Sequence, residues 1–320
     1  MRLCIVSKNK RTEVMFRRGW IEAADEECIK VELVRRSEGM LPLFCKVLCE
    51  KFKGNRIGTF GVSESLLMSL IKPDLMLFSG LGRLLDKDSK LRKILFKWLL
   101  VTCRHSVVVC LNHDDLRILN AIGFTRVYKI NGEGYQRKPA GRKSLLRKGD
   151  FLYVGRLLKS KGLTVVLDCF LASRLRDCTL NIVGDRDFGN SDSLSQQEED
   201  SYVRRSSGLI RFHGYKVDLS DYYTSDAIYV SASKREGMPF SVLEALDNQM
   251  FCILSKVPGH KDLAKFSKVR LFKDKDELIK AMVSIKNINE SDKVISELNV
   301  YSKDSVKTEI KNIYKAVMHE

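Results

Sequence analysis

Residues 227–246 read AIYVSASKREGMPFSVLEAL, and this stretch decides which fold the chain can adopt. Ala227–Ser231 is an apolar, β-branched run of the kind that forms a buried strand. Gly237 and Pro239 then favour a turn, and a helix is expected from Phe240–Ser241. Backbone N–H groups at a helix start, together with the positive end of the helix dipole, suit an anion. The stretch therefore predicts a strand, a tight loop and a helix whose first turn can bind a phosphate.

Two carboxylates lie on either side of this turn. Glu236 precedes it and Glu244 follows it, with seven residues between them. Both carboxylates could accept hydrogen bonds from the hydroxyls of one extended ligand. The spacing is equally compatible with a solvated loop acid at Glu236 and a first-turn acid at Glu244 that the helix dipole favours.

A second segment, Val154–Gly162, has the sequence VGRLLKSKG and follows another predicted strand. Gly155 would let a ligand approach the backbone closely. Arg156 can bind phosphate oxygens with two parallel hydrogen bonds, and Lys161 supplies a mobile positive charge. The alternative is a basic surface loop with no ligand.

Outward from these segments, short apolar runs alternate with helical patterns throughout the chain, which is typical of parallel sheets covered on both faces. Strands are predicted over Leu3–Ser7, Val31–Val34, Asp74–Ser79, Ser106–Leu111, Phe151–Gly155, Thr179–Val183, Leu209–His213, Ala227–Ser231 and Phe251–Ser255. Helices are predicted over Trp20–Lys30, Leu41–Lys51, Lys90–Cys103, Leu163–Ala172, Leu219–Thr224, Ser241–Gln249, Lys275–Ile285 and the tail Asp292–His319. The pattern predicts an α/β protein with two Rossmann-like domains whose βα turns face a shared cleft.

The length of 320 residues suggests two domains. The linker between them lies within 131–148, which is rich in glycine and cations and contains one proline. We therefore expect domains of 1–145 and 146–320. The final helix is free to pack back on the first domain. The net charge is +16, and residues 1–150 hold 30 Lys+Arg against 16 Asp+Glu. The first domain should therefore favour a polyanionic partner, such as an anionic membrane surface or a phosphorylated substrate.

Several classes of protein are disfavoured. No apolar run approaches the ~20 residues of a spanning helix, and the start resembles no signal peptide. The nine cysteines form no CxxC pair, so we expect reduced thiols, no metal site and a cytoplasmic protein, with attachment to the inner face of the cell membrane left open. A Walker A loop and a complete G-x-G-x-x-G are both absent.

The order of the motifs resembles a known family. Gly-Arg-Leu-x-x-x-Lys-Gly before Glu-Gly-x-Pro-x-Ser-x-x-Glu-Ala is similar to the retaining glycosyltransferases of family 4 (glycosyl transferases group 1). Three further segments agree in order: Ile130-Asn131-Gly132, Asn181-Ile182-Val183-Gly184 and Phe212-His213-Gly214. The resemblance covers about residues 106–285 and implies the GT-B fold, with a nucleoside-diphosphate sugar held mainly by the second domain.

The resemblance also implies roles for individual residues. Arg156 and Lys161 would bind the donor diphosphate, Glu236 would contact the donor sugar, and Glu244 would bind the ribose. The remaining donor-binding residues would be Gly155, Gly184, Gly214, Tyr215, Gly237, Met238, Pro239, Phe240 and Ser241. Such enzymes need no metal, because Arg and Lys neutralise the leaving diphosphate.

The first domain departs from the family pattern. It lacks the Gly-Gly loop after the first strand, and Phe78–Arg83 stands where many members carry a His, so we assign no catalytic His. Gly82 and Arg83 follow a strand and could meet an acceptor pyrophosphate, and His113 follows the next strand. His260 follows Val257-Pro258-Gly259, a predicted βα turn at the cleft.

The sequence thus predicts a retaining glycosyltransferase that moves a hexose-type sugar from a UDP- or GDP-sugar to a glycan or lipid-diphosphate acceptor, in bacterial lipopolysaccharide O-antigen or capsule biosynthesis. The basic helix Lys90–Cys103 has an apolar face of Leu91, Ile94, Leu95 and Trp98, which would pack on the core or enter a headgroup layer. The alternative is a non-catalytic basic protein that binds membrane or nucleic acid. Against nucleic acid, aromatic residues do not interleave with the cations.

Overall fold

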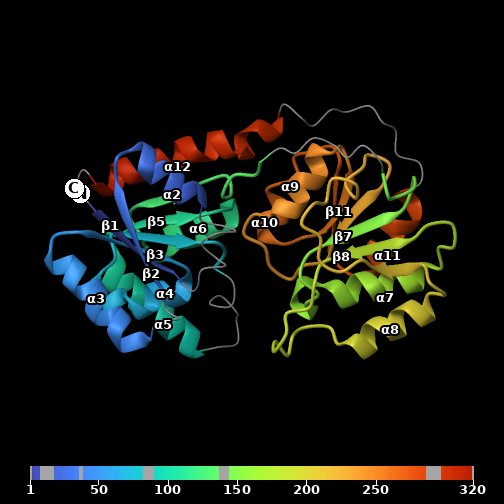
Figure 1. Ribbon diagram of the computed structural model, residues 1–320, viewed down its shortest axis with the longest axis horizontal. Coiled ribbons are helices and arrows are strands. Elements are labelled where there is room, and N and C mark those ends of the chain that lie inside the picture. Colours follow the sequence, from blue (N-terminus) through green and yellow to red (C-terminus); the bar gives the residue numbers. More distant parts are fainter. Residues whose placement is uncertain are drawn as a thin grey trace. The chain divides into compact units, whose positions relative to one another are not determined.

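The computed structural model describes residues 2–7, 18–35, 39–81, 90–136, 144–285 and 297–318, without the side chains of residues 90–93. The chain divides into two compact units. One unit comprises Met1–Tyr135 and Val300–Glu320, and the other comprises Gln136–Asn299. The units therefore divide at Tyr135 rather than near residue 145, and the last 21 residues return to the first unit (Figure 1).

The first unit is built on a six-stranded parallel sheet in the order β2-β1-β3-β4-β5-β6. Its strands are β1(Arg2–Ser7), β2(Lys30–Arg35), β3(Arg56–Phe60), β4(Leu75–Phe78), β5(Val107–Cys110) and β6(Val127–Lys129). In β4 and β5 every residue is buried. Uninterrupted apolar runs form such strands because helices cover both faces of the sheet.

The helices of the first unit are α2(Arg18–Glu26), α3(Met40–Phe52), α4(Val62–Leu67), η2(Ser69–Ile71), α5(Lys90–Cys103), α6(His113–Ile122) and α12(Lys303–Met318). The last of these, α12, packs along α2 (Figure 1). Tyr314 donates its hydroxyl to the carbonyl of Trp20 at 2.8 Å, and both side chains are fully buried. Lys303 pairs with Glu22 at 2.6 Å. The final helix thus completes the core of a unit that begins some 300 residues earlier.

The second unit contains a parallel sheet in the order β12-β11-β10-β7-β8-β9. Its strands are β7(Phe151–Val154), β8(Leu180–Val183), β9(Ile210–Phe212), β10(Ile228–Ser231), β11(Phe251–Ser255) and β12(Val269–Phe272). Numbered from the first strand of the unit, this order is the 3-2-1-4-5-6 of nucleotide-binding Rossmann sheets.

The helices of the second unit are η4(Lys159–Lys161), α7(Leu163–Ser173), α8(Gln196–Arg205), α9(Phe240–Asp247), α10(Pro258–Lys261) and α11(Lys275–Ser284). Figure 1 shows α7 and α9 on opposite sides of the sheet. A short helix, η6(Glu297–Tyr301), lies where the chain returns to the first unit. The predicted α/β fold of two parallel-sheet units is confirmed.

Some predicted elements were wrong or missing. Leu219–Thr224 is not a helix, because only a single turn forms there, with the N–H groups of Tyr222 and Tyr223 both donating to the carbonyl of Leu219. The sequence also missed the strands β3, β6 and β12. Two of these, β6 and β12, are edge strands in which Phe272 is the one buried residue, and this weakens the apolar signal.

Helix α5 contributes Phe96, Leu99 and Cys103 to the core. Of the apolar residues for which the sequence left core packing or membrane contact open, Ile94 and Trp98 are 64% and 48% exposed. The indole N–H of Trp98 donates to the hydroxyl of Ser69 at 3.1 Å. Among the described helices, none is both long and apolar enough to cross a bilayer.

Candidate active site

The candidate site lies where the neighbouring strands β7 and β10 end. The next two strands after β7 in the chain, β8 and β9, lie on one side of it, whereas β10 and the strands that follow β10 lie on the other, so the strand order reverses between β7 and β10. Ligands of open parallel sheets bind at such a switch point, beyond the carboxyl ends of the strands. Two hydrogen bonds join the loops that follow the two strands: the Lys234 N–H donates to the Ser160 carbonyl at 3.2 Å, and the Ser233 hydroxyl donates to the Lys161 carbonyl at 3.3 Å.

Gly162 allows these loops to lie this close. Its φ is +71°, and a Cβ at this position would fall on the carbonyl group of Ala232, which follows β10. Only glycine combines that backbone conformation with that closeness. Gly162 therefore brings η4, and Lys161 with it, against the end of β10.

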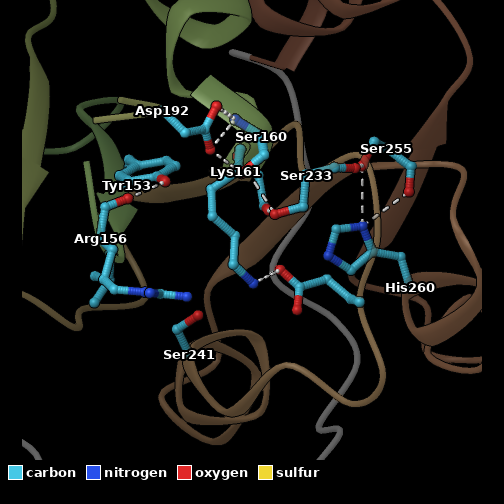
Figure 2. Close-up of polar contacts among 12 residues, drawn as sticks. Tyr153, Arg156, Ser160, Lys161, Asp192, Ser233, Ser241, Ser255 and His260 are labelled. Carbon is cyan, nitrogen blue, oxygen red and sulfur yellow. Dashed lines mark hydrogen bonds and ion pairs between the residues drawn. The ribbon is translucent and has the colours of Figure 1, made fainter. Parts of the chain in front are cut away.

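Lys161 and Glu236 form an ion pair across the site. The Lys161 Nζ lies 2.7 Å from Oε1 of Glu236, and the two side chains are 32% and 14% exposed (Figure 2). Glu236 is thus not a solvated loop acid, since most of its side chain is buried against a cation. The pair joins the two motifs that the sequence singled out, which are 75 residues apart in the chain.

Arg156 lies directly after Gly155 at the end of β7. Its guanidinium Nη1 is 3.0 Å from Oδ2 of Asp187, a residue that the sequence analysis did not select. Figure 2 shows the Arg156 guanidinium, the Lys161 ammonium and the Ser241 hydroxyl pointing toward the same region. Both cations are paired with carboxylates in this structure, and both can exchange that partner for a phosphate without a change of fold.

Three predicted donor-binding glycines meet at the ends of β7, β8 and β9. The N–H of Gly184 donates to the carbonyl of Gly214 at 3.0 Å. A Cβ on Gly184, whose φ is +152°, would fall on the carbonyl of Gly155. Tyr215 follows this cluster and is exposed. The three glycines therefore bring the carboxyl ends of these strands into close backbone contact, and an exposed aromatic residue follows the last of them.

Helix α9 begins at Phe240, four residues after Glu236 in the chain. Its N-cap residue is Pro239, which has no side-chain donor or acceptor. Gly237 and Met238 are buried, and the Ser241 hydroxyl lies 2.7 Å from the hydroxyl of Tyr229. The predicted strand, loop and helix are confirmed in this stretch. The Pro239 side chain does not cap the start of α9, where the positive end of the helix dipole suits an anion.

Glu244 lies one turn inside α9. It accepts a hydrogen bond from the hydroxyl of Tyr223 at 3.0 Å. Burial and the neighbouring Glu244 carboxylate raise the pKa of Tyr223 well above its ordinary value, so this tyrosine remains a donor at neutral pH. Tyr223 therefore holds the Glu244 carboxylate in one orientation.

The predicted acceptor residues belong to the first unit. Gly82 and Arg83 lie outside the described residues. His113 is the exposed first residue of α6, after Asn112, whose side chain accepts from the N–H of Asp115 at 2.8 Å. In the part of the chain that the structure describes, no three His, Cys, Asp or Glu side chains are grouped so that they could hold a metal ion.

Comparison with known proteins gives the class of this site. Residues 148–287 match the family described as Glycosyl transferases group 1. An Escherichia coli UDP-Gal:alpha-D-GlcNAc-diphosphoundecaprenol alpha-1,3-galactosyltransferase is 26% identical over 235 residues, which are 66% of this chain and 58% of that protein. The chain therefore spans 58% of the length of this relative.

Solved structures share the whole fold. Anabaena Alr3699/HepE in complex with UDP superposes with a TM-score of 0.73 at 14% identity, over 99% of this chain and 100% of that one. A sucrose-phosphate synthase from Thermosynechococcus elongatus gives a TM-score of 0.74 at 13% identity, over 100% and 99%. The fold is therefore that of the GT-B glycosyltransferases. Within that fold, residues 148–287 are similar in sequence to the group 1 glycosyl transferases.

Proposed function

We propose that this protein transfers a hexose-type sugar from a nucleoside-diphosphate sugar to a lipid-linked or glycan acceptor. One observation carries the proposal: Arg156, Lys161 and Glu236 gather at the switch point of the second sheet, next to the start of α9. Two cations and a helix start suit a diphosphate, and a mostly buried carboxylate suits the hydroxyls of a sugar. Glu244, oriented by Tyr223, would hold the ribose.

In this mechanism the bond between the anomeric carbon and the diphosphate oxygen breaks as the acceptor oxygen bonds to that carbon. Arg156 and Lys161 neutralise the charge that develops on the leaving diphosphate, and no metal is needed. The leaving phosphate oxygen accepts the proton of the acceptor hydroxyl on the same face of the sugar. The anomeric configuration is then retained. Glu236 and Glu244 are both used to hold the donor, so neither carboxylate is assigned as a nucleophile. The retention of configuration is inferred from the resemblance to retaining family 4 enzymes.

The donor and acceptor are proposed from the relatives. The E. coli relative is named for UDP-Gal and for a GlcNAc-diphosphoundecaprenol acceptor, and HepE is described in complexes with UDP and UDP-glucose. We therefore propose a UDP-hexose donor, with a GDP-sugar as the other option, and a sugar-diphosphate lipid acceptor. The reaction would belong to bacterial surface polysaccharide assembly.

A diphosphate lipid acceptor places the reaction at a membrane. We propose that the first unit binds the anionic surface of the membrane through α5 and η2. Ile94, Trp98 and Val101 are 64%, 48% and 74% exposed and recur at helical spacing, and Leu70 in the adjoining η2 is also exposed. Lys97 lies in α5, Lys72 directly follows η2, and both are exposed. Apolar side chains bordered by cations are typical of helices that lie in a headgroup layer.

The decisive experiment is a transfer assay with UDP-galactose, UDP-glucose and a GDP-hexose, each with a short-chain GlcNAc-diphosphate lipid, with and without EDTA. We expect one donor to be consumed with EDTA present, and NMR of the product to show the anomeric configuration of the donor. A donor at a hundredfold its Kd should also stabilise the protein by ~2.7 kcal/mol. Inversion refutes the retaining mechanism. Failure of every donor to bind or react favours the non-catalytic alternative.

A further inference from the structure

His260 is a fully buried histidine next to the candidate site. It belongs to α10, which follows β11, and it has no exposed surface. Its Nδ1 lies 2.9 Å from the carbonyl oxygen of Ser255 and 3.2 Å from the Ser255 hydroxyl (Figure 2). The proposed mechanism assigns this side chain no role.

The hydrogen bonds of His260 determine which ring nitrogen carries the proton. A carbonyl oxygen can only accept, so Nδ1 must carry a hydrogen and donate it to Ser255. The Ser255 hydroxyl donates its own hydrogen to the carbonyl of Ser233 at 2.6 Å. The other nitrogen, Nε2, is therefore a bare acceptor. It is buried and has no hydrogen-bond partner among the described residues.

An unpartnered buried nitrogen is costly and needs an explanation. In Figure 2 this nitrogen lies on the side of the ring that faces the Lys161 ammonium. The N–H of Gly259, the preceding residue, donates to the carbonyl of Glu236 at 3.1 Å. Helix α10 is therefore hydrogen-bonded to the backbone of Glu236, the acidic member of the ion pair.

Burial lowers the pKa of His260 below its ordinary value, so the ring is neutral while Lys161 is paired with Glu236. Two charged groups also act on His260 from the elements packed around it. Glu236, from the loop before α9, raises the pKa of His260, whereas Lys161, from η4, lowers it. Ser255, the hydrogen-bond partner of His260, carries no charge, and neither does Ser233, which accepts from the Ser255 hydroxyl.

We infer that His260 is a positioning residue that takes up a proton at Nε2 when the donor diphosphate draws Lys161 away from Glu236. The inference rests on the proposed function. Lys161 reaches Glu236 at 2.7 Å, and a phosphate competes directly for that ammonium. Glu236 then loses its cation although its side chain is only 14% exposed. A proton from solvent on Nε2 supplies the missing positive charge and keeps Glu236 oriented toward the donor sugar.

The inference predicts a sign for the pH dependence of donor binding. When the donor diphosphate neutralises Lys161, the positive charge that lowers the pKa of His260 is lost, whereas the Glu236 carboxylate that raises it remains. Donor binding therefore raises the pKa of His260. Donor binding must then take up protons between the pKa of the free protein and that of the complex. Donor affinity should rise as pH falls through this range.

Proton uptake can be measured by titration calorimetry with the UDP-sugar that binds, at one pH in buffers of low and high ionisation enthalpy. A UDP-sugar suits this test because its diphosphate is a diester that does not titrate near neutrality. We expect uptake of up to about one proton per donor bound by the native protein, the capacity of a single imidazole.

Two variants separate the roles of the two ring nitrogens. His260→Gln places an uncharged N–H near the position of Nε2, whereas His260→Asn places one near Nδ1 and retains the donor to Ser255. We expect no proton uptake by either variant. We expect the donor affinity of the Gln variant to fall less than that of the Asn variant, which should bind about tenfold more weakly than the native protein, the size expected for one charge-assisted hydrogen bond. A merely structural histidine would give the reverse order, because only Asn restores the buried contact.

Binding without proton uptake by the native protein, uptake that persists in both variants, or Asn equal to or better than Gln would overturn the inference and leave the proposed function intact. If no nucleoside-diphosphate sugar binds at all, the proposed function fails, and the inference fails with it.

Discussion

At the scale of single residues, the proposed chemistry uses cations that are already paired. Lys161 lies 2.7 Å from Glu236 and Arg156 lies 3.0 Å from Asp187, so a diphosphate would replace existing partners instead of entering an empty basic site. This exchange favours a ligand that offers two adjacent anionic groups over a single anion. The carboxylates also keep the cations oriented when no donor is bound.

The first prediction concerns Lys161→Ala. The substitution removes one charge-assisted contact to the diphosphate, worth roughly 1.5–3 kcal/mol, so donor affinity and turnover should fall about tenfold to a hundredfold. Calorimetric titration with the donor and initial rates would measure both. Lys159→Ala is the matched control, because Lys159 is two residues away and pairs with Glu198 at 2.8 Å on the surface. Similar losses in the two variants would argue against a specific role for Lys161.

At the scale of elements, the site requires η4 to contact the end of β10. Gly162 makes this contact possible, so we predict that Gly162→Ala separates the two loops and abolishes donor binding. The added methyl group must displace the backbone at Ala232, and the positive φ adds a further ~1–2 kcal/mol. Thermal melts and donor titrations would measure the two effects.

Gly208→Ala is the matched control for this prediction. Gly208 has a φ of +81°, and a Cβ there meets nothing within 4 Å. It should therefore lose only the stability that the backbone conformation costs, and it should bind donor normally. If Gly162→Ala melts and binds like Gly208→Ala, the close approach is not essential to the site.

At the scale of the whole molecule, charge and exposed apolar surface are unevenly distributed. Most of the net charge of +16 lies in the first 150 residues, and the exposed side chains of α5 belong to the same unit. We predict that the protein co-sediments with anionic vesicles at low salt and is released at 1 M salt, where the screening length falls to ~3 Å. Neutral vesicles should retain little protein.

Replacing the apolar side chains tests which surface is responsible for vesicle binding. The double variant Ile94→Gln with Val101→Gln should bind anionic vesicles several-fold more weakly, since each buried CH₂ contributes about 0.8 kcal/mol. Both side chains are mostly exposed, so folding should be unaffected. Val283→Gln, at an exposed position on α11 of the second unit, is the control. Equal vesicle binding by all three proteins would remove the membrane proposal and leave the transferase proposal in place.

The fold class and the strands and loops that carry the candidate site could be predicted from local sequence patterns. Strands such as β4 and β7 are short apolar runs, and their signal is contained in four to six neighbouring residues. Arg156 and Glu236 could be selected because each follows a strand, and in a parallel sheet all carboxyl ends lie along one edge. The strand, loop and helix of residues 227–246 were predictable for the same local reason.

Only the tertiary structure decided which side chains meet. Asp187 is 31 residues from Arg156, and the periodicity of the sequence cannot predict an ion pair between residues that far apart. His260 could be placed in a βα turn from the sequence, but the bare Nε2 depends on contacts with Ser255 and on burial. The return of α12 to the first unit likewise depends on Tyr314 and Trp20, 294 residues apart. Local periodicity determines secondary structure, whereas partners, protonation and unit boundaries follow from contacts between distant parts of the chain.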